Sequence, residues 1–168
     1  MEMNRIKNII WDWNGTLLDD IDICIECMND MLGKRQLQAI SKSRYLEIFT
    51  FPVKDYYSSA GIDFQKYPFE KTGIEFIKAY QKKLPDCTIH DDAADIIEYF
   101  HSKSYKQIIL SAMEENALRK SVSKFNILKY FDGIYGIQDH YANGKEDIAK
   151  KMMRINKLLP SESIIIGD

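Results

Sequence analysis

The stretch Ile9-Ile10-Trp11-Asp12-Trp13-Asn14-Gly15-Thr16-Leu17-Leu18-Asp19 decides the fold of this chain. Its apolar start predicts a buried strand over residues 6–12, and this strand ends in the carboxylate of Asp12. The turn that follows contains a glycine and a hydroxyl, so we expect Gly15 and Thr16 to bind phosphate beside that carboxylate. An aspartate can attack phosphorus directly and hold the phosphoryl group as an acyl phosphate. Asp12 is therefore the candidate nucleophile.

The composition is that of an ordinary globular protein. The chain has 168 residues, of which 45% are apolar and 29% charged, and this length is enough for one core and a smaller satellite. The net charge of −2 gives no electrostatic reason to expect nucleic acid or an anionic membrane as a partner. The N-terminus leads into a strand and not into a signal peptide. With three cysteines and no secretory signal, we expect reduced thiols in a cytoplasmic protein. We also expect a monomer or a weak homodimer.

Cysteines and histidines give no sign of a metal site. Cys24 and Cys27 form a C-x-x-C, but the apolar residues between Ile21 and Leu32 recur with a helical period. Both thiols are therefore expected to pack on a helix as small hydrophobes, and no second pair completes a tetrahedral zinc site. Three histidines have no metal-like spacing and are expected to be surface or packing residues: His90, His101 and His140.

After the first strand, the pattern is predominantly helical to residue 84, with no strand signal. Two glycines are predicted helix stops, two serines predicted helix starts, and a proline the start of a further helix: Gly33, Gly61, Ser41, Ser43 and Pro52. Of the 18 Phe and Tyr residues of the chain, 10 lie in this block, enough for a core of its own. The block is much longer than the dozen or so residues that a crossover between strands needs. It is therefore predicted to be a separate domain.

Beyond Pro85, helical and strand patterns alternate. Apolar runs predict strands at 107–110, 133–137 and 163–166, with helical patterns between them. Continuous apolar runs are typical of parallel strands that helices cover on both faces. The predicted fold is therefore α/β, a Rossmann-like parallel sheet formed by residues 1–17 and 86–168, with an inserted all-α domain at 18–85.

Polar residues follow the predicted strands at the edge where open parallel sheets bind ligands. Asp12 ends the first strand, and Ser111 ends the second. Lys145 lies at the start of the helix that precedes the last strand, and Asp168 follows that strand after Gly167. A carboxylate nucleophile, a hydroxyl, an ammonium group and a second carboxylate are suited to phosphoryl transfer through a metal ion.

Taken singly, these residues have simpler interpretations. Ser111 alone is an ordinary hydroxyl at a strand end. Lys145 alone is a solvated charge, and Lys150 and Lys151 are rival candidates for its role. Trp13 beside the nucleophile could contact a ligand. Asp12 within its motif already favours a functional site, and the order of the four residues favours catalytic roles for Ser111 and Lys145 as well.

In this order, the chain resembles the haloacid dehalogenase superfamily of phosphohydrolases. Residues 12–17 are similar to its first motif, and Ser111, Lys145 and the pair 167–168 are similar to its second, third and fourth motifs. The resemblance covers the whole chain, and the helical block is similar to the cap domain of the phosphoglycolate phosphatase branch. It implies that Asp12 forms an aspartyl phosphate.

The resemblance also implies a cofactor. Mg²⁺ would be bound by Asp12, by the backbone carbonyl of Asn14 and by the carboxylate of Asp168. Ser111, the backbone N–H of Ala112 and Lys145 would hold the transferring phosphoryl oxygens. The implied activity is the Mg²⁺-dependent hydrolysis of a small phosphorylated metabolite.

Two departures from the family pattern matter. Most phosphatases of the superfamily have a second, proton-shuttling aspartate where this chain has Asn14, and general acid–base catalysis contributes about 10²–10⁴-fold. The substrate then has an acidic leaving group such as an acyl phosphate or pyrophosphate, or another carboxylate (Glu114, Glu115 or one from the cap) shuttles the proton. The remaining alternative is a catalytically weak phosphate-binding or regulatory protein. The second departure is the ending at Asp168, from which we expect an incomplete stretch of a longer protein.

Overall fold

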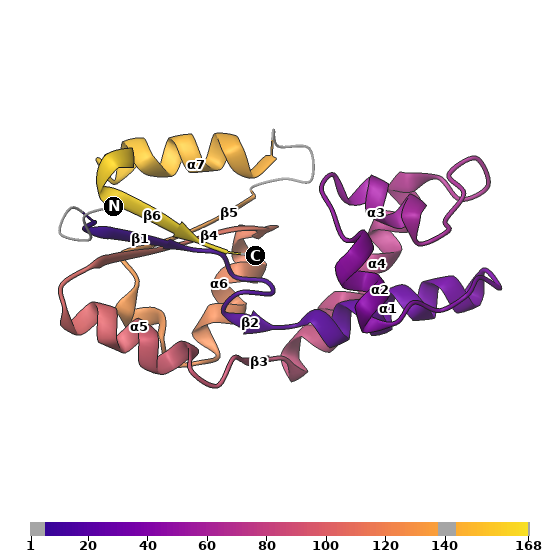
Figure 1. Cartoon of the computed structure of the whole chain (residues 1–168), viewed down its shortest axis with the longest axis horizontal. Coiled ribbons are helices and arrows are strands. Elements are labelled where there is room, and N and C mark those ends of the chain that lie inside the picture. The colour runs from indigo at the N-terminus through magenta and orange to yellow at the C-terminus, as the bar shows by residue number, and fades with distance from the viewer. Residues whose placement is uncertain (1–5, 138–143, 168) are drawn as a thin grey trace. The chain divides into compact units, whose positions relative to one another are not determined.

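The computed structural model describes residues 6–137 and 144–167. The chain forms two compact units. The sheet unit contains the described residues up to Asp19 and from Thr88 onward, and the helical unit is Asp20–Cys87 (Figure 1). The sequence predicts the helical insert over 18–85, two residues earlier at each end.

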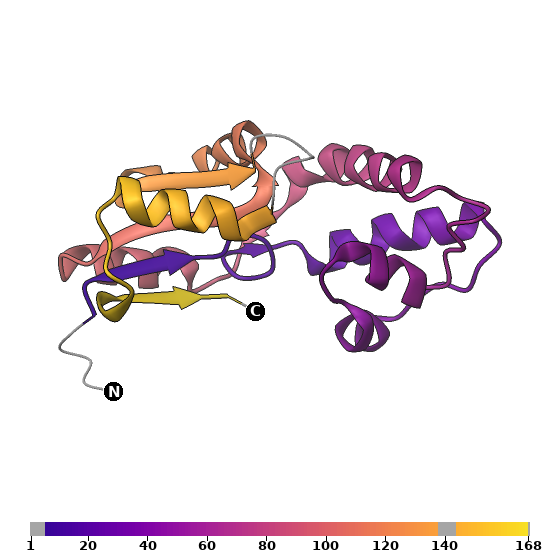
Figure 2. The same cartoon turned by 90° about the horizontal axis from the view of Figure 1, so that it is seen from above.

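A four-stranded parallel sheet forms the centre of the sheet unit (Figure 2). Its strands lie in the order β5-β4-β1-β6: Gly133–Ile137, Lys106–Glu114, Asn8–Trp11 and Ser163–Ile166. In the centre of the sheet, Ile10 lies opposite Ile108 on one side and Ile165 on the other. The predicted α/β class with a parallel sheet is confirmed. The first strand is shorter than predicted, because Asp12 already belongs to the loop.

Helices cover both faces of this sheet (Figure 1). Helix α7 (Gly144–Ile155) lies on one face, where Ile10 packs with Met152. Helices α5 (Ala93–Ser102) and α6 (Glu115–Ser123) lie on the other. Neighbouring residues of a strand point to opposite faces, so Trp11 packs against Phe100 of α5, with the ring centroids 6.0 Å apart.

Two short strands mark where the chain leaves the sheet unit and returns to it. Strand β2 (Leu18–Asp19) pairs antiparallel with β3 (Thr88–Ile89), so that Leu18 lies opposite Ile89. The prediction that no strand lies between the first strand and residue 84 is wrong here. Strands of two residues have no periodicity, and their pairing joins segments about 70 positions apart, so a local pattern cannot reveal them.

The helical unit consists of four α-helices with their own core: α1 (Ile21–Lys34), α2 (Lys42–Ile48), α3 (Val53–Ser59) and α4 (Phe69–Lys83). Aromatic rings dominate this core. Tyr56 packs edge-on against Tyr45 and Tyr57, with both centroid distances at 5.6 Å. Cys27 is fully buried and Cys24 half-buried on α1, and neither is in a disulfide. Their interpretation as packing residues is confirmed.

The predicted helix ends hold only in part. Ser41 caps α2 by accepting a hydrogen bond from the N–H of Arg44 at 3.1 Å, whereas Ser43 lies inside the helix. Pro52 precedes α3 directly, and Gly61 follows it with a φ of 101°. Gly33 is not a helix stop, because α1 continues through it to Lys34 and the left-handed residue is Gln36, with a φ of 57°. Two of these predictions are therefore wrong, those for Gly33 and Ser43.

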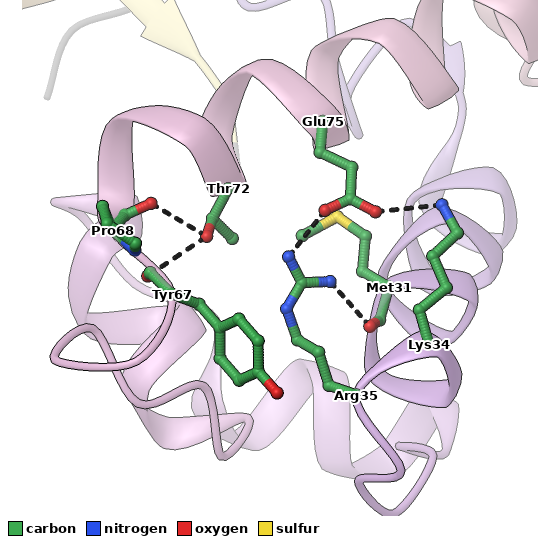
Figure 3. A network of polar contacts seen from close by, with 7 residues as sticks. All are labelled: Met31, Lys34, Arg35, Tyr67, Pro68, Thr72 and Glu75. Atoms are coloured by element: carbon green, nitrogen blue, oxygen red, sulfur yellow. Dashed lines mark hydrogen bonds and ion pairs between the residues drawn. The ribbon is translucent and has the colours of Figure 1, made fainter.

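A polar network joins the end of α1 to α4 within the helical unit (Figure 3). The carboxylate of Glu75 accepts hydrogen bonds from Arg35 at 2.6 Å and from Lys34 at 2.9 Å. Arg35 also donates to the carbonyl of Met31 at 2.8 Å and lies 4.8 Å from the ring centroid of Tyr67. The Arg35 hydrogen bond lowers the pKa of Glu75 below its usual value.

His90 and His101 make contacts within the sheet unit. His101 packs beside Tyr130 at a centroid distance of 5.1 Å. The backbone N–H of His90 donates to Leu17 at 3.1 Å. His140 lies outside the described residues. Among the helices of the described segments, none has the length and apolar character that crossing a membrane requires.

Candidate active site

The loop after β1 holds Asp12 in a defined place. The backbone N–H of Asp12 donates to Ile166 at 2.8 Å, and carboxylate oxygen Oδ1 accepts the N–H of Trp13 at 2.7 Å. The carbonyl of Trp13 then accepts the N–H groups of Leu17 and Leu18 at 3.0 and 2.8 Å. The side chain of Asp12 is 18% exposed. A tight loop thus holds a partly accessible carboxylate just beyond the carboxyl end of a central strand.

Gly15 and Thr16 shape this loop. Gly15 has a φ of 71°, a conformation that favours glycine, and its N–H donates to Leu18 at 3.1 Å. The N–H of Thr16 donates to the carbonyl of Trp13 at 3.4 Å. Both N–H groups therefore make hydrogen bonds within the loop. The binding of phosphate by these two residues stays a prediction.

Lys145 reaches Asp12 from the first turn of α7. Its ammonium group donates to Oδ2 of Asp12 in an ion pair. Charge-assisted hydrogen bonds of this kind are stronger than neutral ones. Lys150 instead pairs with Glu146 of the same helix at 2.6 Å, and Lys151 is exposed. Of the three candidate lysines, the structure brings Lys145 to the carboxylate.

Ser111 and Asn14 also meet, although 97 residues separate them. The hydroxyl of Ser111, a residue only 1% exposed, donates to Oδ1 of Asn14 at 3.1 Å. The same hydroxyl accepts the backbone N–H of Met113 at 3.0 Å. The structure therefore brings two pairs of the predicted catalytic residues into contact, Asp12 with Lys145 and Asn14 with Ser111. Their catalytic roles stay predictions.

Strand β4 continues past Ser111, which corrects the predicted strand end. It runs to Glu114, with an irregular register against β5 between Leu110 and Glu114. Ala112, whose N–H is predicted to bind phosphate, is exposed in this irregular segment.

Gly136 of β5 supports this segment and was missed by the sequence analysis. A Cβ atom at position 136 would lie 2.5 Å from the carbonyl oxygen of Met113 and 2.7 Å from the Cα of Glu115. Only glycine therefore allows β5 to approach the chain after Ser111. A glycine inside a strand pattern is the signal that could have revealed it, because such glycines often mark a close backbone approach.

The donor set near Asp12 is suited to Mg²⁺, which prefers oxygen ligands. Asp12 offers a carboxylate and Asn14 a backbone carbonyl. Gly167 lies directly against Asp12, since a Cβ atom at position 167 would be 3.1 Å from the Cβ of Asp12. Asp168, the third predicted ligand, lies outside the described residues. Within 6–137 and 144–167, no three His, Cys, Asp or Glu side chains are grouped to hold a metal ion.

Trp13 belongs to the core, and the idea that it could contact a ligand is wrong. Its side chain is fully buried. The indole N–H donates to the hydroxyl of Ser121 at 3.2 Å, and the ring packs against Phe125 at a centroid distance of 6.0 Å. Trp13 thus anchors the loop that contains Asp12 to helix α6.

Comparison with known proteins gives a family and a fold. A family model described as haloacid dehalogenase-like hydrolase matches residues 9–168. A curated protein of Caldanaerobacter subterraneus subsp. tengcongensis, named "Putative pyrophosphatase PpaX", is 20% identical over 98% of this chain and 74% of its own length.

Solved structures with the same fold cover nearly the whole chain. A haloacid dehalogenase-like family hydrolase from Streptococcus pneumoniae has a TM-score of 0.83 at 21% identity, covering 98% of this chain and 77% of its own. A protein from Haemophilus somnus, described as a predicted phosphoglycolate phosphatase, has a TM-score of 0.76 at 15% identity, with coverages of 98% and 77%. At these identities the structures show the fold alone.

Proposed function

The chain belongs to the haloacid dehalogenase-like hydrolases, and from this premise we propose that it hydrolyses a small phosphorylated metabolite through an aspartyl phosphate on Asp12. The contact between Lys145 and Asp12 carries this proposal. An ammonium group beside a nucleophilic carboxylate is placed to attract the phosphoryl group that the carboxylate attacks. Such preorganised charge is usually the largest contribution to the catalysis of phosphoryl transfer.

The proposed reaction has two steps. An oxygen of Asp12 bonds to phosphorus while the bond from phosphorus to the leaving oxygen breaks. Water then attacks the phosphorus of the aspartyl phosphate, and its bond to Asp12 breaks to release inorganic phosphate. Lys145 and the N–H of Ala112 hold the phosphoryl oxygens during both steps, and the hydroxyl of Ser111 holds the Asn14 side chain.

Mg²⁺ is part of this proposal. Asp12, the carbonyl of Asn14 and Asp168 would hold the ion, and its charge would offset the negative charge of a phosphate beside the carboxylates. The residues of the site thus include one cation from the chain, Lys145, and ligands of the type that bind a second.

The names of related proteins are the only support that the comparisons give for a substrate class. One curated relative is named "Putative pyrophosphatase PpaX", and one solved structure is described as a predicted phosphoglycolate phosphatase. We propose a small phosphorylated metabolite on this basis. A cytoplasmic location and a monomeric or weakly dimeric state stay predictions.

Phosphate release from a panel of phosphorylated metabolites, with and without Mg²⁺, tests the proposed function on the full chain. We expect release from at least one compound in the presence of Mg²⁺ and its loss on chelation. Asp12→Asn should abolish this release, whereas Asp132→Asn is a control for the change of charge, because Asp132 directly precedes β5 and its carboxylate accepts the N–H of Gln107. Turnover by Asp12→Asn at the wild-type rate would exclude the proposal.

A second candidate function is a phosphate-binding or regulatory protein with weak catalysis. The amide of Asn14, held by Ser111 at 3.1 Å, favours it, because an amide cannot shuttle protons. Binding of inorganic phosphate and Mg²⁺ without turnover of any compound in the panel would support this second function.

A further inference from the structure

The side chain of Asn14 has a fixed orientation that bears on the choice of substrate. Its carbonyl oxygen accepts the hydroxyl of Ser111, and that hydroxyl accepts the N–H of Met113. A backbone N–H can only donate, so the hydroxyl proton of Ser111 is left for the amide oxygen of Asn14. The amide therefore has its oxygen toward β4.

An amide in this position limits the chemistry at Asp12, two residues earlier. It can donate an N–H to an oxygen, but it has no proton to transfer near neutral pH and it cannot accept one from water. Asn14 would therefore give no proton to the leaving oxygen as it departs. Asn14 would likewise remove no proton from the water that attacks in the second step.

The two carboxylates that follow Ser111 have other partners. Glu114 caps helix α6, with one oxygen accepting the N–H of Asn116 and the other the N–H of Ala117, both at 2.9 Å. These contacts stabilise the start of the helix. To carry protons to a substrate, Glu114 would have to abandon this cap.

Glu115 is likewise paired. It accepts a hydrogen bond from Arg119 at 2.9 Å, and Arg119 also donates to the carbonyl of Ile134 at 2.8 Å. The ion pair directs this carboxylate along α6 toward its own helix. Neither glutamate after Ser111 is thus placed as a substitute for a proton-shuttling aspartate at position 14.

We propose, building on the proposed function, that the site selects substrates whose leaving group departs as a stable anion, namely acyl phosphates and phosphoanhydrides. In the first step an oxygen of Asp12 bonds to phosphorus, and the bond to the leaving oxygen breaks with both electrons going to that oxygen. The released carboxylate or phosphate needs no proton. An alkyl phosphate would have to release an alkoxide, which does need one.

The second step follows the same balance. A water oxygen bonds to phosphorus and the bond from phosphorus to Asp12 breaks, while the water proton passes to a phosphoryl oxygen or to solvent. Since Asn14 removes no proton from this water, hydrolysis of the aspartyl phosphate becomes the slow step. The phosphorylated form of Asp12 therefore accumulates when the leaving group is a good one.

Rates for substrates with different leaving groups test this proposal on the full chain with Mg²⁺. We expect acetyl phosphate and pyrophosphate to react at least about 100-fold faster than glycerol phosphate. This factor is the lower end of the rate enhancement that a general acid usually contributes. Asn14→Asp should narrow this ratio by about 10²-fold, mainly through faster glycerol phosphate hydrolysis. Asn126→Asp, an exposed loop position after α6, is the matched control and should leave the ratio unchanged.

A second readout is independent of turnover. Wild-type protein is mixed with acetyl phosphate labelled in its phosphoryl group and then quenched with acid. It should carry the label on Asp12, and Asn14→Asp should carry less because its second step is faster. Hydrolysis of glycerol phosphate by the wild type as fast as acetyl phosphate, with label on Asp12, would overturn the substrate class and leave the proposed function intact. Absence of both turnover and label with every compound would overturn both.

Discussion

The ammonium group of Lys145 forms an ion pair with the carboxylate of Asp12, although 133 residues separate the two in the sequence. The contact depends on the parallel sheet, because β1 carries Asp12 to its carboxyl end and α7 packs on the same sheet through Met152. It is thus a product of the fold and not of local sequence.

Replacing Lys145 by alanine should lower kcat by about 10²–10³-fold, the usual effect of removing one group that stabilises transition-state charge. Steady-state kinetics on any substrate found active will measure it. Lys150→Ala is the matched control, because Lys150 lies on the same helix and pairs with Glu146 at 2.6 Å. Equal rates for Lys145→Ala and wild type would show that the ion pair has no catalytic role.

Replacing Ser111 by alanine should destabilise the sheet unit. The change removes the acceptor of the Met113 N–H and the donor to Asn14 at a buried position. Leaving such groups unpaired costs about 1–3 kcal/mol, which urea denaturation will detect. Ser123→Ala, which removes an exposed hydroxyl at the end of α6, serves as the reference. A Ser111→Ala protein as stable as the reference would mean that these hydrogen bonds do not hold the site together.

Trp13 is expected to act on stability and not on substrate affinity. Trp13→Ala should lower the free energy of unfolding by about 3–5 kcal/mol, because it empties a fully buried site. Trp13→Phe keeps most of the packing against Phe125 and loses the hydrogen bond to Ser121. This milder variant should keep the wild-type KM. A large rise in KM without loss of stability would return Trp13 to the role of a ligand contact.

The helical unit should lose stability in acid through Glu75. Its pKa is lowered mainly by the hydrogen bond from Arg35, so the unfolded chain binds this proton more readily than the folded protein. The stabilisation is therefore fully present above the unfolded pKa, near 4.5, and disappears as the pH falls through the lower folded pKa.

Glu75→Gln measures this contribution. Unfolding monitored from neutral to acidic pH should show the variant less stable than wild type at neutral pH, with the difference vanishing in acid. Glu47→Gln, which removes an exposed partner of Arg44, should have little effect at any pH. A difference between Glu75→Gln and wild type that is constant with pH would rule out the ion pair as its cause.

The central strands β1 and β4 were predictable because most of their residues are apolar and buried between helices on both faces. Runs such as residues 9–11 and 108–110 are apolar throughout, and this signal depends on no distant residue. Helix ends were less predictable. Gly33 looks like a stop, yet α1 continues through it and Gln36 adopts the left-handed conformation. Tertiary packing of α1 thus outweighs the local preference of glycine.

The members of the candidate site could be predicted from their types and order, but their contacts could not. The sequence alone does not reveal that Asn14 accepts a hydrogen bond from Ser111, because this contact depends on how the loop after β1 turns toward β4. Burial of Trp13 was missed for the same reason. Its partner Ser121 lies on a helix 108 residues away.

Reduction of the phosphorylated protein is the most direct test that Asp12 is the nucleophile. Protein mixed with acetyl phosphate and Mg²⁺ would be quenched and treated with borohydride, which converts an aspartyl phosphate into homoserine. Peptide mass spectrometry should then find homoserine at position 12 and unmodified aspartate at Asp19 and Asp20. Homoserine at another position, or unmodified Asp12 in protein that turns acetyl phosphate over, would contradict the covalent mechanism.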